Sequence, residues 1–192
     1  MTTNSETPLL ECDYLIVGAG AAPLAFIDTL LTELPETKII LIDKKAAPGG
    51  HWVDAYGFVR LHQPSIVYGI SSKQLEGNWL KLLLTKFMLP WKHRANKQQI
   101  LTYFGDFVNE KVASQQVTFY PNCVYNFETN NEKHDSSTTI STTTSTTITT
   151  DNNQDDGMYS FSSVDGSVTY KVKVNVKLIN ATDGECIIPC GT

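Results

Sequence analysis

The sequence has no apolar run long enough to cross a membrane and no excess of positive charge. A membrane-spanning helix needs about 20 consecutive apolar residues, but the longest hydrophobic stretch is interrupted by Gly18, Gly20 and Pro23. The residues before that stretch include acids and no base, the reverse of a secretory signal peptide. We therefore predict a cytoplasmic protein. The formal net charge of -5 argues against nucleic-acid partners and polybasic membrane binding.

Cysteine and histidine are few and scattered, which leaves no pattern typical of a metal site. The cysteines form no CxxC pair, and the histidines do not complete a set of zinc ligands. We predict no metal, and reduced thiols in or near a core. A redox pair formed by the last two cysteines is the alternative. The cysteines are Cys12, Cys123, Cys186 and Cys190.

Hydrophobic periodicity predicts a strand, a helix and a second strand in the first part of the chain. Residues 13–17 form a short apolar run rich in Val and Ile, residues 21–34 repeat apolar positions at helical spacing, and residues 38–43 are apolar again. Such a unit is nearly always right-handed, with its two strands parallel. The segment 44–71 follows, and it is rich in Gly, Pro and aromatic residues without clear periodicity.

The rest of the chain predicts further helices and strands around one polar insert. Within residues 72–89 the pattern allows a short helix, and residues 96–114 form a clear amphipathic helix. Strands follow, divided at Pro121. The Ser/Thr-rich tract at about 130–156 is predicted to be disordered. After it we expect an antiparallel hairpin around Asp165 and Gly166 and a last strand. The last strand is predicted over residues 175–181.

We therefore predict an α/β fold that combines a parallel nucleotide-binding half with an antiparallel meander. The predicted domain organisation is a flexible leader over residues 1–11 and a single domain over residues 12–192. The Ser/Thr-rich tract is interpreted as an insertion within that domain, because strands resume after it.

The glycine turn after the first strand is the main candidate for a binding site. A tight turn there leaves N–H groups at the helix N-terminus without intrahelical acceptors, and these can hold a pyrophosphate. Gly18 permits the turn and Gly20 permits close approach of the backbone. Pro23 occupies the place of the usual third glycine, so we expect a weakened grip that is not abolished. The predicted cofactor-binding residues of the turn are Gly18, Ala19, Gly20, Ala21 and Ala22.

An acid at the end of the second strand extends this candidate site. Asp43 stands where a carboxylate can accept the hydroxyls of an adenosine ribose. The acid argues against a 2′-phosphate, although Lys44 and Lys45 adjoin it and keep NADP open as an alternative. Lys44 is included in the predicted site. A plain strand-helix-strand unit, with Asp43 as a capping acid, is the structural alternative.

The irregular segment supplies the remaining candidates from the residues themselves. Paired glycines, of which Gly50 is the second, permit close approach to a flat ligand. Trp52 offers a large surface with one N–H donor. His51 and His62, together with Gln63 and Ser65, could hydrogen-bond the rim of such a ligand, and an ordinary loop position is the alternative for each.

Three stretches carry a resemblance to a known family: "DYLIVGAGAAPLAF", "LIDKKAAPGGHWVDAYGFVRLHQPS" and "INATDGECIIP". Together they resemble the FAD-binding half of NAD(P)/FAD-dependent oxidoreductases, a group that includes the flavin-containing monooxygenases. The "GGHW" stretch is similar to a GGxW element that the family places beside the flavin. The resemblance implies a Rossmann-like FAD-binding domain with a parallel sheet and a small antiparallel β-meander. It also implies FAD as cofactor, with Val124 near the adenine and Ala181 at the end of an ATG-type strand.

The same resemblance implies a flavin-dependent oxidoreductase of the monooxygenase type. Members of the family continue into an NADPH domain, whereas this chain ends at Thr192, soon after the ATG-like strand. A truncated form is therefore expected, with a partner chain or oligomer covering the missing half. The alternative is a non-catalytic flavin- or nucleotide-binding remnant, or an interaction protein. The sequence indicates neither a catalytic residue nor a substrate.

Overall fold

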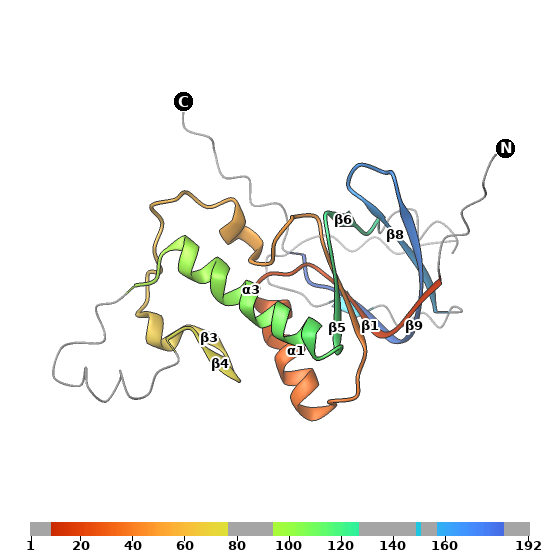
Figure 1. Cartoon of the computed structure of the whole chain (residues 1–192), viewed down its shortest axis with the longest axis horizontal. Helices are drawn as coiled ribbons and strands as arrows, with labels where there is room; N and C mark the ends of the chain where they lie inside the picture. Colours follow the sequence, from red (N-terminus) through yellow and green to blue (C-terminus); the bar gives the residue numbers. More distant parts are fainter. Residues whose placement is uncertain (1–8, 77–93, 127–148, 151–156, 183–192) are drawn as a thin grey trace.

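The computed structural model describes residues 9–76, 94–126, 149–150 and 157–182. Its central element is a mixed sheet with the strand order β5-β2-β1-β9-β8-β6, in which β7 also pairs with β9 (Figure 1). The first four of these strands run parallel to one another. They are β5 (Val117–Pro121), β2 (Ile39–Asp43), β1 (Leu9–Val17) and β9 (Thr169–Asn180).

The other half of the sheet is antiparallel. β8 pairs with β9 on one side and with β6 on the other, and β7 pairs with the end of β9. A separate two-stranded antiparallel sheet is formed by β3 and β4. These strands are β6 (Cys123–Val124), β7 (Thr149–Thr150), β8 (Met158–Ser163), β3 (Gly69–Ile70) and β4 (Lys73–Gln74).

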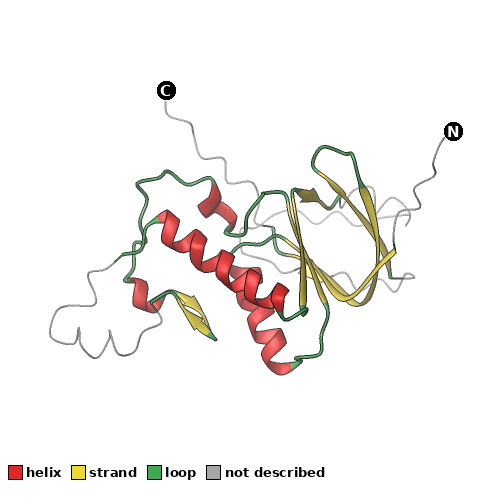
Figure 2. Cartoon of the chain, in the orientation of Figure 1, coloured by secondary structure: helices red, strands yellow, loops and turns green. Residues whose placement is uncertain are grey.

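Two helices pack on one side of the parallel strands, as Figure 2 shows. They are α1 (Ala21–Glu33) and α3 (Lys97–Ala113). Asn96 begins α3 with a capping box, in which its side chain and that of Gln99 accept each other's backbone N–H. The connection between β2 and β3 contains two short 3-10 turns, η1 (Gly50–Val53) and η2 (Ser65–Val67). This connection and the two helices form the layer that lies against the glycine turn.

Alternating side chains of the parallel strands contribute to two hydrophobic clusters, one on each face. Ile16 of β1 points toward the helices, whereas Leu15 and Val17 point to the other face. The helix-side cluster includes Leu24, Ile27, Leu41, Ile100, Phe104, Phe107 and Ile179. The opposite cluster includes Cys12, Ile40, Ile42, Cys123, Phe161, Val172 and Leu178. Both faces of the parallel strands are therefore covered, as their continuous apolar runs indicate.

The hairpin predicted around Asp165 and Gly166 is confirmed, and it joins β8 to β9. Gly166 has a positive φ of 71°, and Ser163 and Ser167 donate hydrogen bonds to the Asp165 carboxylate. These hydrogen bonds lower the pKa of Asp165 to about 2, so the turn keeps its charged acceptor at acidic pH. Across the hairpin, Phe161 stacks on Tyr170 with ring centroids 4.9 Å apart.

Two strand boundaries differ from the sequence expectation. β1 begins at Leu9, inside the range assigned to the leader, because residues from Leu9 onward pair with β9. The predicted last strand at 175–181 is not a separate element. It is the second half of β9, whose first residues pair with β8 and which pairs with β1 from Lys171 onward. One long strand therefore replaces the predicted pair.

The Ser/Thr-rich tract and the predicted short helix fall largely outside the described residues. Within the tract, Thr149 and Thr150 pair with Ile179 and Asn180 of β9, so these two residues differ from the expected disorder. Of the segment 72–89, the part that is described forms β4 and a turn. The remaining predicted helix lies outside the described residues.

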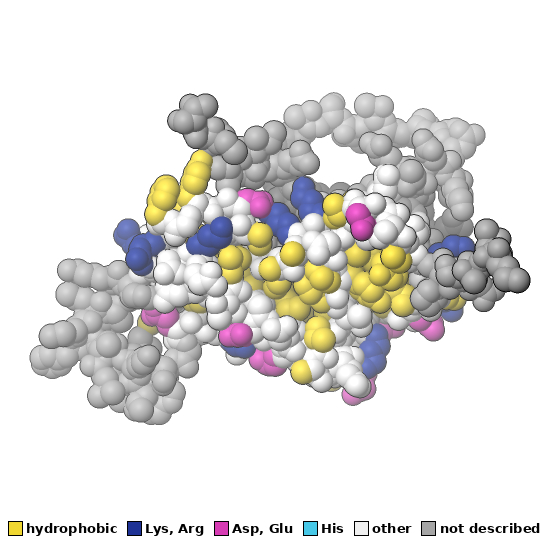
Figure 3. All heavy atoms as spheres, turned by 45° about the horizontal axis from the view of Figure 1, so that its top comes forward, with side chains coloured by type: hydrophobic (Ala, Val, Ile, Leu, Met, Phe, Trp, Pro, Cys, Tyr) yellow, Lys and Arg dark blue, Asp and Glu magenta, His cyan; other side chains and the backbone are white. Residues whose placement is uncertain are grey.

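None of the described helices is long and apolar enough to cross a membrane. Figure 3 shows hydrophobic side chains gathered across the middle of one face, with acidic and basic side chains interspersed around them. That face therefore carries no extended field of one sign.

Candidate functional site

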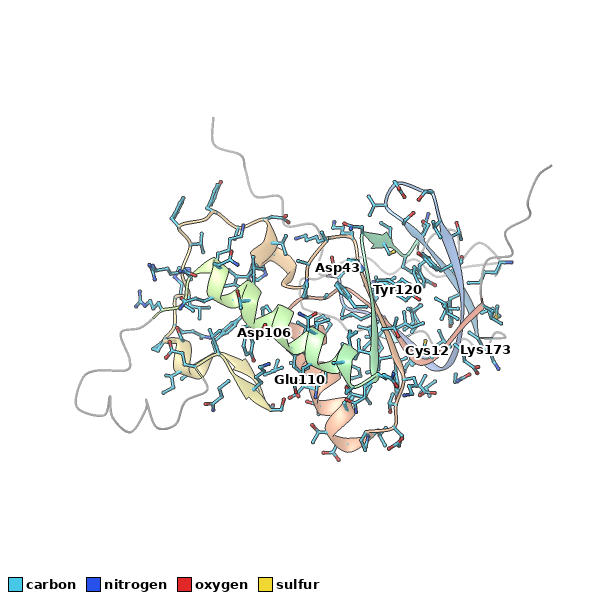
Figure 4. All side chains as sticks on the ribbon, in the orientation of Figure 1. Cys12, Asp43, Asp106, Glu110, Tyr120 and Lys173 are labelled. Carbon is cyan, nitrogen blue, oxygen red and sulfur yellow. The ribbon has the colours of Figure 1, made fainter. Side chains whose placement is uncertain are left out.

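The predicted site lies where the parallel strands end. Val17 at the end of β1 is in register with Ile42 on one side and Asn180 on the other, and Asp43 is in register with Pro121. The carboxyl ends of parallel strands are where open α/β sheets bind ligands. Figure 4 shows Asp43 toward this end of the strands, with Cys12 toward the opposite end.

Gly18 is the residue on which the sharp turn after β1 depends. Its φ is +102°, a conformation that side chains rarely adopt. A Cβ atom here would also lie 2.9 Å from the Ala181 carbonyl oxygen, which is too close. The Gly18 N–H donates to the carbonyl of Ile42 at 2.8 Å, and the Ala181 N–H donates to Val17 at 2.9 Å. The predicted residues Gly18 and Ala181 are thus adjacent, on neighbouring strands.

The turn leads directly into the N-terminus of α1, for which Gly20 is the N-cap. In an α-helix the first N–H groups have no intrahelical acceptor. Here Gly20, Ala21 and Ala22 provide these donors, while Pro23 provides none. Ala21 and Ala22 are exposed, and Pro23 is buried within the first turn. Pro23 therefore removes one donor without breaking the helix, as the sequence predicts.

Asp43 is buried and holds the turn to the end of β2. It is 6% exposed, and its Oδ2 accepts the Ala19 N–H at 2.6 Å. Its Oδ1 accepts the Lys45 N–H at 2.8 Å. A carboxylate has about four lone-pair positions, so two acceptor positions remain for a further donor. The acid predicted for a ribose thus also orients the backbone of the glycine turn.

The paired glycines lie directly against the first turn. The Gly49 N–H donates to the Ala19 carbonyl at 2.8 Å, and a Cβ on Gly50 would lie 3.0 Å from the Gly20 Cα. Gly49 and Gly50 both have positive φ, 139° and 55°. The sequence analysis assigned both glycine elements to one site, and the structure brings them into contact, with Gly50 in a left-handed conformation that favours glycine.

Two lysines hold the η1 turn, a role that sequence reasoning assigned to neither of them. The Lys45 ammonium donates to the Gly50 carbonyl at 2.8 Å and pairs with the Asp54 carboxylate. The Lys97 ammonium donates to the carbonyls of Val53 and Ala55 at 2.9 and 2.7 Å. Only their positions in the sequence could have suggested this role. Lys45 comes two residues after Asp43, and Lys97 is the first residue of α3. Lys44, which the sequence assigned to the site, has an exposed side chain.

Trp52 and His51 follow the glycine pair with opposite exposures. Trp52 is 7% exposed and belongs to the helix-side cluster, so most of its surface is committed to the core. Burial raises the pKa of Tyr68, and a hydrogen bond with Trp52 opposes that rise. His51 is exposed, with its ring 5.3 Å from the Trp52 ring centroid. Of the two, His51 is the more accessible to a ligand.

The other predicted residues lie farther along the chain. His62 is exposed between η1 and η2, whereas Ser65 is fully buried and its hydroxyl accepts the Ala95 N–H at 2.6 Å. Ser65 therefore anchors the connection to the start of α3. Val124 lies on β6, just after Asn122, whose N–H donates to the Lys45 carbonyl. Within the described residues, no three metal-ligating side chains gather into a metal site.

Comparison with known proteins gives relatives by sequence but no family. No family model matches the chain. An uncharacterized protein of Mycobacterium tuberculosis is 37% identical over 128 residues, and one from Mycobacterium bovis matches equally well. The match covers 64% of this chain and 22% of each relative. The chain thus spans about a fifth of the length of the curated relatives it matches.

Solved structures with a similar fold are oxidoreductases. A closed form of cyclohexanone monooxygenase aligns with a TM-score of 0.55 at 17% identity, covering 96% of this chain and 28% of that one. A bacillithiol disulfide reductase from Staphylococcus aureus gives 0.54 at 10% identity, covering 91% and 39%. A flavin-containing monooxygenase from Stenotrophomonas maltophilia gives 0.52 at 14%, covering 90% and 38%. The chain therefore shares its fold with these enzymes.

Proposed function

We propose that this chain binds FAD and forms the cofactor-binding part of a flavin-dependent oxidoreductase of the monooxygenase type. The adenosine-diphosphate half of the cofactor binds at the turn from Gly18 to Ala22. The observation that carries the proposal is the contact between this turn and the second glycine pair. Two glycine-dependent backbone segments meet there, beside an oriented carboxylate and the N-terminus of α1.

The residues present fit a dinucleotide on chemical grounds. The N–H groups of Gly20, Ala21 and Ala22 offer donors to a diphosphate, and the exposed side chains of the two alanines leave that end of α1 open. Asp43 has acceptor capacity left for ribose hydroxyls. Its negative charge disfavours a 2′-phosphate, which supports FAD over NADP. The order β5-β2-β1-β9 of the parallel strands agrees with the first half of a dinucleotide-binding sheet.

The flavin end of the cofactor would extend toward the η1 turn and its exposed His51. When bound, FAD supplies the redox chemistry, and the chain binds and orients it. The backbone N–H groups of the glycine turn bind the diphosphate, and Asp43 binds the ribose. The buried Trp52 keeps the η1 turn packed on the core. We assign neither a catalytic acid or base nor a substrate.

The proposal is tested by the visible spectrum of the purified chain after incubation with FAD and removal of the free cofactor. We expect a flavin spectrum at about one FAD per chain, followed by bleaching when NADPH is added. Gly20→Val is the matched variant, and we expect it to retain no flavin. A chain that remains colourless after reconstitution contradicts the proposal. A flavin spectrum that NADPH does not bleach supports binding without turnover.

A further inference from the structure

Lys45 links three segments of the chain at the edge of the candidate site. Its backbone N–H donates to Asp43 and its carbonyl accepts the Asn122 N–H at 3.1 Å. Its ammonium reaches the Gly50 carbonyl at 2.8 Å and pairs with Asp54. The side chain is 19% exposed. One residue thus connects the end of β2, the turn after β5 and the η1 turn.

The η1 turn depends on such a link because its backbone is intrinsically permissive. Gly49 and Gly50 have no side chain to restrict them, so they lose more conformational freedom on ordering than other residues do. Lys97 holds the later part of the turn, through the carbonyls of Val53 and Ala55. At the start of the turn, the Lys45 ammonium donates to the Gly50 carbonyl and the Gly49 N–H donates to the Ala19 carbonyl.

We propose that Lys45 is a positioning residue, which sets the affinity of the site for its dinucleotide by holding Gly50 against Gly20. It acts through the η1 turn, because its ammonium is held between the Gly50 carbonyl and the Asp54 carboxylate. This inference rests on the proposed function. Its structural part, the hold on the turn, can be measured without any ligand.

The test is a set of variants titrated with FAD, followed by flavin fluorescence. Lys45→Met is expected to weaken FAD binding about tenfold, the factor that one charge-assisted hydrogen bond carries. Lys171 is exposed on β9 and pairs with Leu9, at the end of β1 far from the glycine turn. Lys171→Met is therefore the control, with affinity unchanged within about twofold, because surface charges contribute little. Asp54→Asn is expected to weaken binding as well, because the ammonium loses its second anchor.

The double variant separates positioning from direct contact. If Lys45 acts with Asp54 through the turn, Lys45→Met combined with Asp54→Asn loses no more affinity than Lys45→Met alone. If the ammonium contacts the diphosphate, Asp54→Asn releases it to the ligand and tightens binding. That result overturns the proposal, and so does an unchanged affinity in Lys45→Met.

A ligand-free measurement distinguishes this inference from the proposed function. In a chain with Trp79→Phe and Trp91→Phe, the emission reports Trp52 alone. We expect Lys45→Met to shift that emission to the red and Lys171→Met to leave it unchanged. A parent chain that binds no FAD overturns the proposed function. In that case the Trp52 emission of Lys45→Met still tests whether Lys45 holds the turn. An unshifted emission spectrum contradicts that role.

Discussion

At the scale of single residues, the site depends on positions where a side chain is missing. A Cβ on Gly20 would lie 3.6 Å from the Gly50 Cα, an ordinary contact, whereas one on Gly18 would collide with the Ala181 carbonyl. A Cβ atom on Gly20 thus fits beside the η1 turn. Gly18 has room for nothing. We therefore expect replacement of Gly18 to disturb the fold itself, and replacement of Gly20 to block the approach of the proposed ligand.

This difference predicts the outcome of substitution at Gly20. Gly20→Val is expected to abolish FAD retention while the chain stays folded, because the added methyl groups would enter the space between the two glycine turns. Ser65→Ala is the control: it leaves the buried Ala95 N–H unpaired and costs about 1–3 kcal/mol of unfolding free energy, with FAD affinity unchanged. Urea unfolding and FAD titration measure the two effects. Equal FAD retention in both variants would show that the turn is only structural.

A second prediction at this scale concerns the Cys12 thiol. Burial raises its pKa to about 12, so the reactive thiolate is scarce in the folded chain. Because the folded pKa lies above the unfolded value, the contribution to stability is complete below about pH 9. It is lost as pH rises toward 12. We expect Cys12 to be alkylated between pH 7 and 9.5 only when the chain has first been unfolded in urea. Peptide mass spectrometry measures the labelling. Rapid labelling of the folded chain at pH 8 would contradict the burial of this thiol.

Sequence reasoning identified the glycines and the acid of the candidate site. It missed the lysines, whose roles depend on the residues that they contact in the fold. Glycine pairs and an acid at the end of a strand predict a turn and an oriented carboxylate, and Gly18, Gly20, Gly50 and Asp43 do lie together. Lys44 and Lys45 look alike in the sequence. The direction of the chain after β2 turns Lys45 toward Asp54 and leaves Lys44 exposed. No local pattern contains that information.

At the scale of elements, β9 shows why strand boundaries were harder to predict than strand existence. Its sequence changes from alternating polar and apolar residues near Tyr170 to a mostly apolar stretch at Leu178 and Ile179. The first part has one covered face and the second part has two, which are patterns usually seen in different strands. Here the same strand passes from the antiparallel hairpin into the parallel sheet, because its first residues pair with β8 and it pairs with β1 from Lys171 to Asn180.

The small β3-β4 sheet is held to both helices by single polar side chains. Asp28 of α1 is 2% exposed and accepts hydrogen bonds from the Ser72 N–H and hydroxyl. The Tyr103 hydroxyl of α3 accepts the Ile70 N–H at 2.7 Å and donates to the Lys73 carbonyl. A hairpin of this size is not stable in water by itself. Its position beside the helices therefore depends on these bonds.

Tyr103→Phe tests that dependence. The variant leaves the Ile70 N–H and the Lys73 carbonyl without their partner, which costs about 1–3 kcal/mol if the groups stay buried. We expect amide exchange over residues 69–74 to accelerate, while exchange in β1 and β2 changes little. Hydrogen exchange read by mass spectrometry measures both. Uniform acceleration across the chain would mean that the small sheet unfolds only with the whole domain.

At the scale of the whole molecule, the arrangement predicts that ligand fragments differ in how strongly they stabilise the fold. The proposed site joins β1, β2, β9 and α1, so a ligand held there resists global unfolding. A ligand present at 100 times its Kd adds about 2.7 kcal/mol to the unfolding free energy. We expect FAD and ADP to raise the thermal midpoint, FAD more than ADP, and riboflavin to leave it unchanged. The reason is that the backbone donors and Asp43 recognise the adenosine-diphosphate half.

Differential scanning fluorimetry with the three ligands at equal concentration makes the comparison, and Gly20→Val should remove the shift for all of them. A midpoint raised by riboflavin but not by ADP would instead place the main binding interaction at the flavin ring, away from the glycine turn.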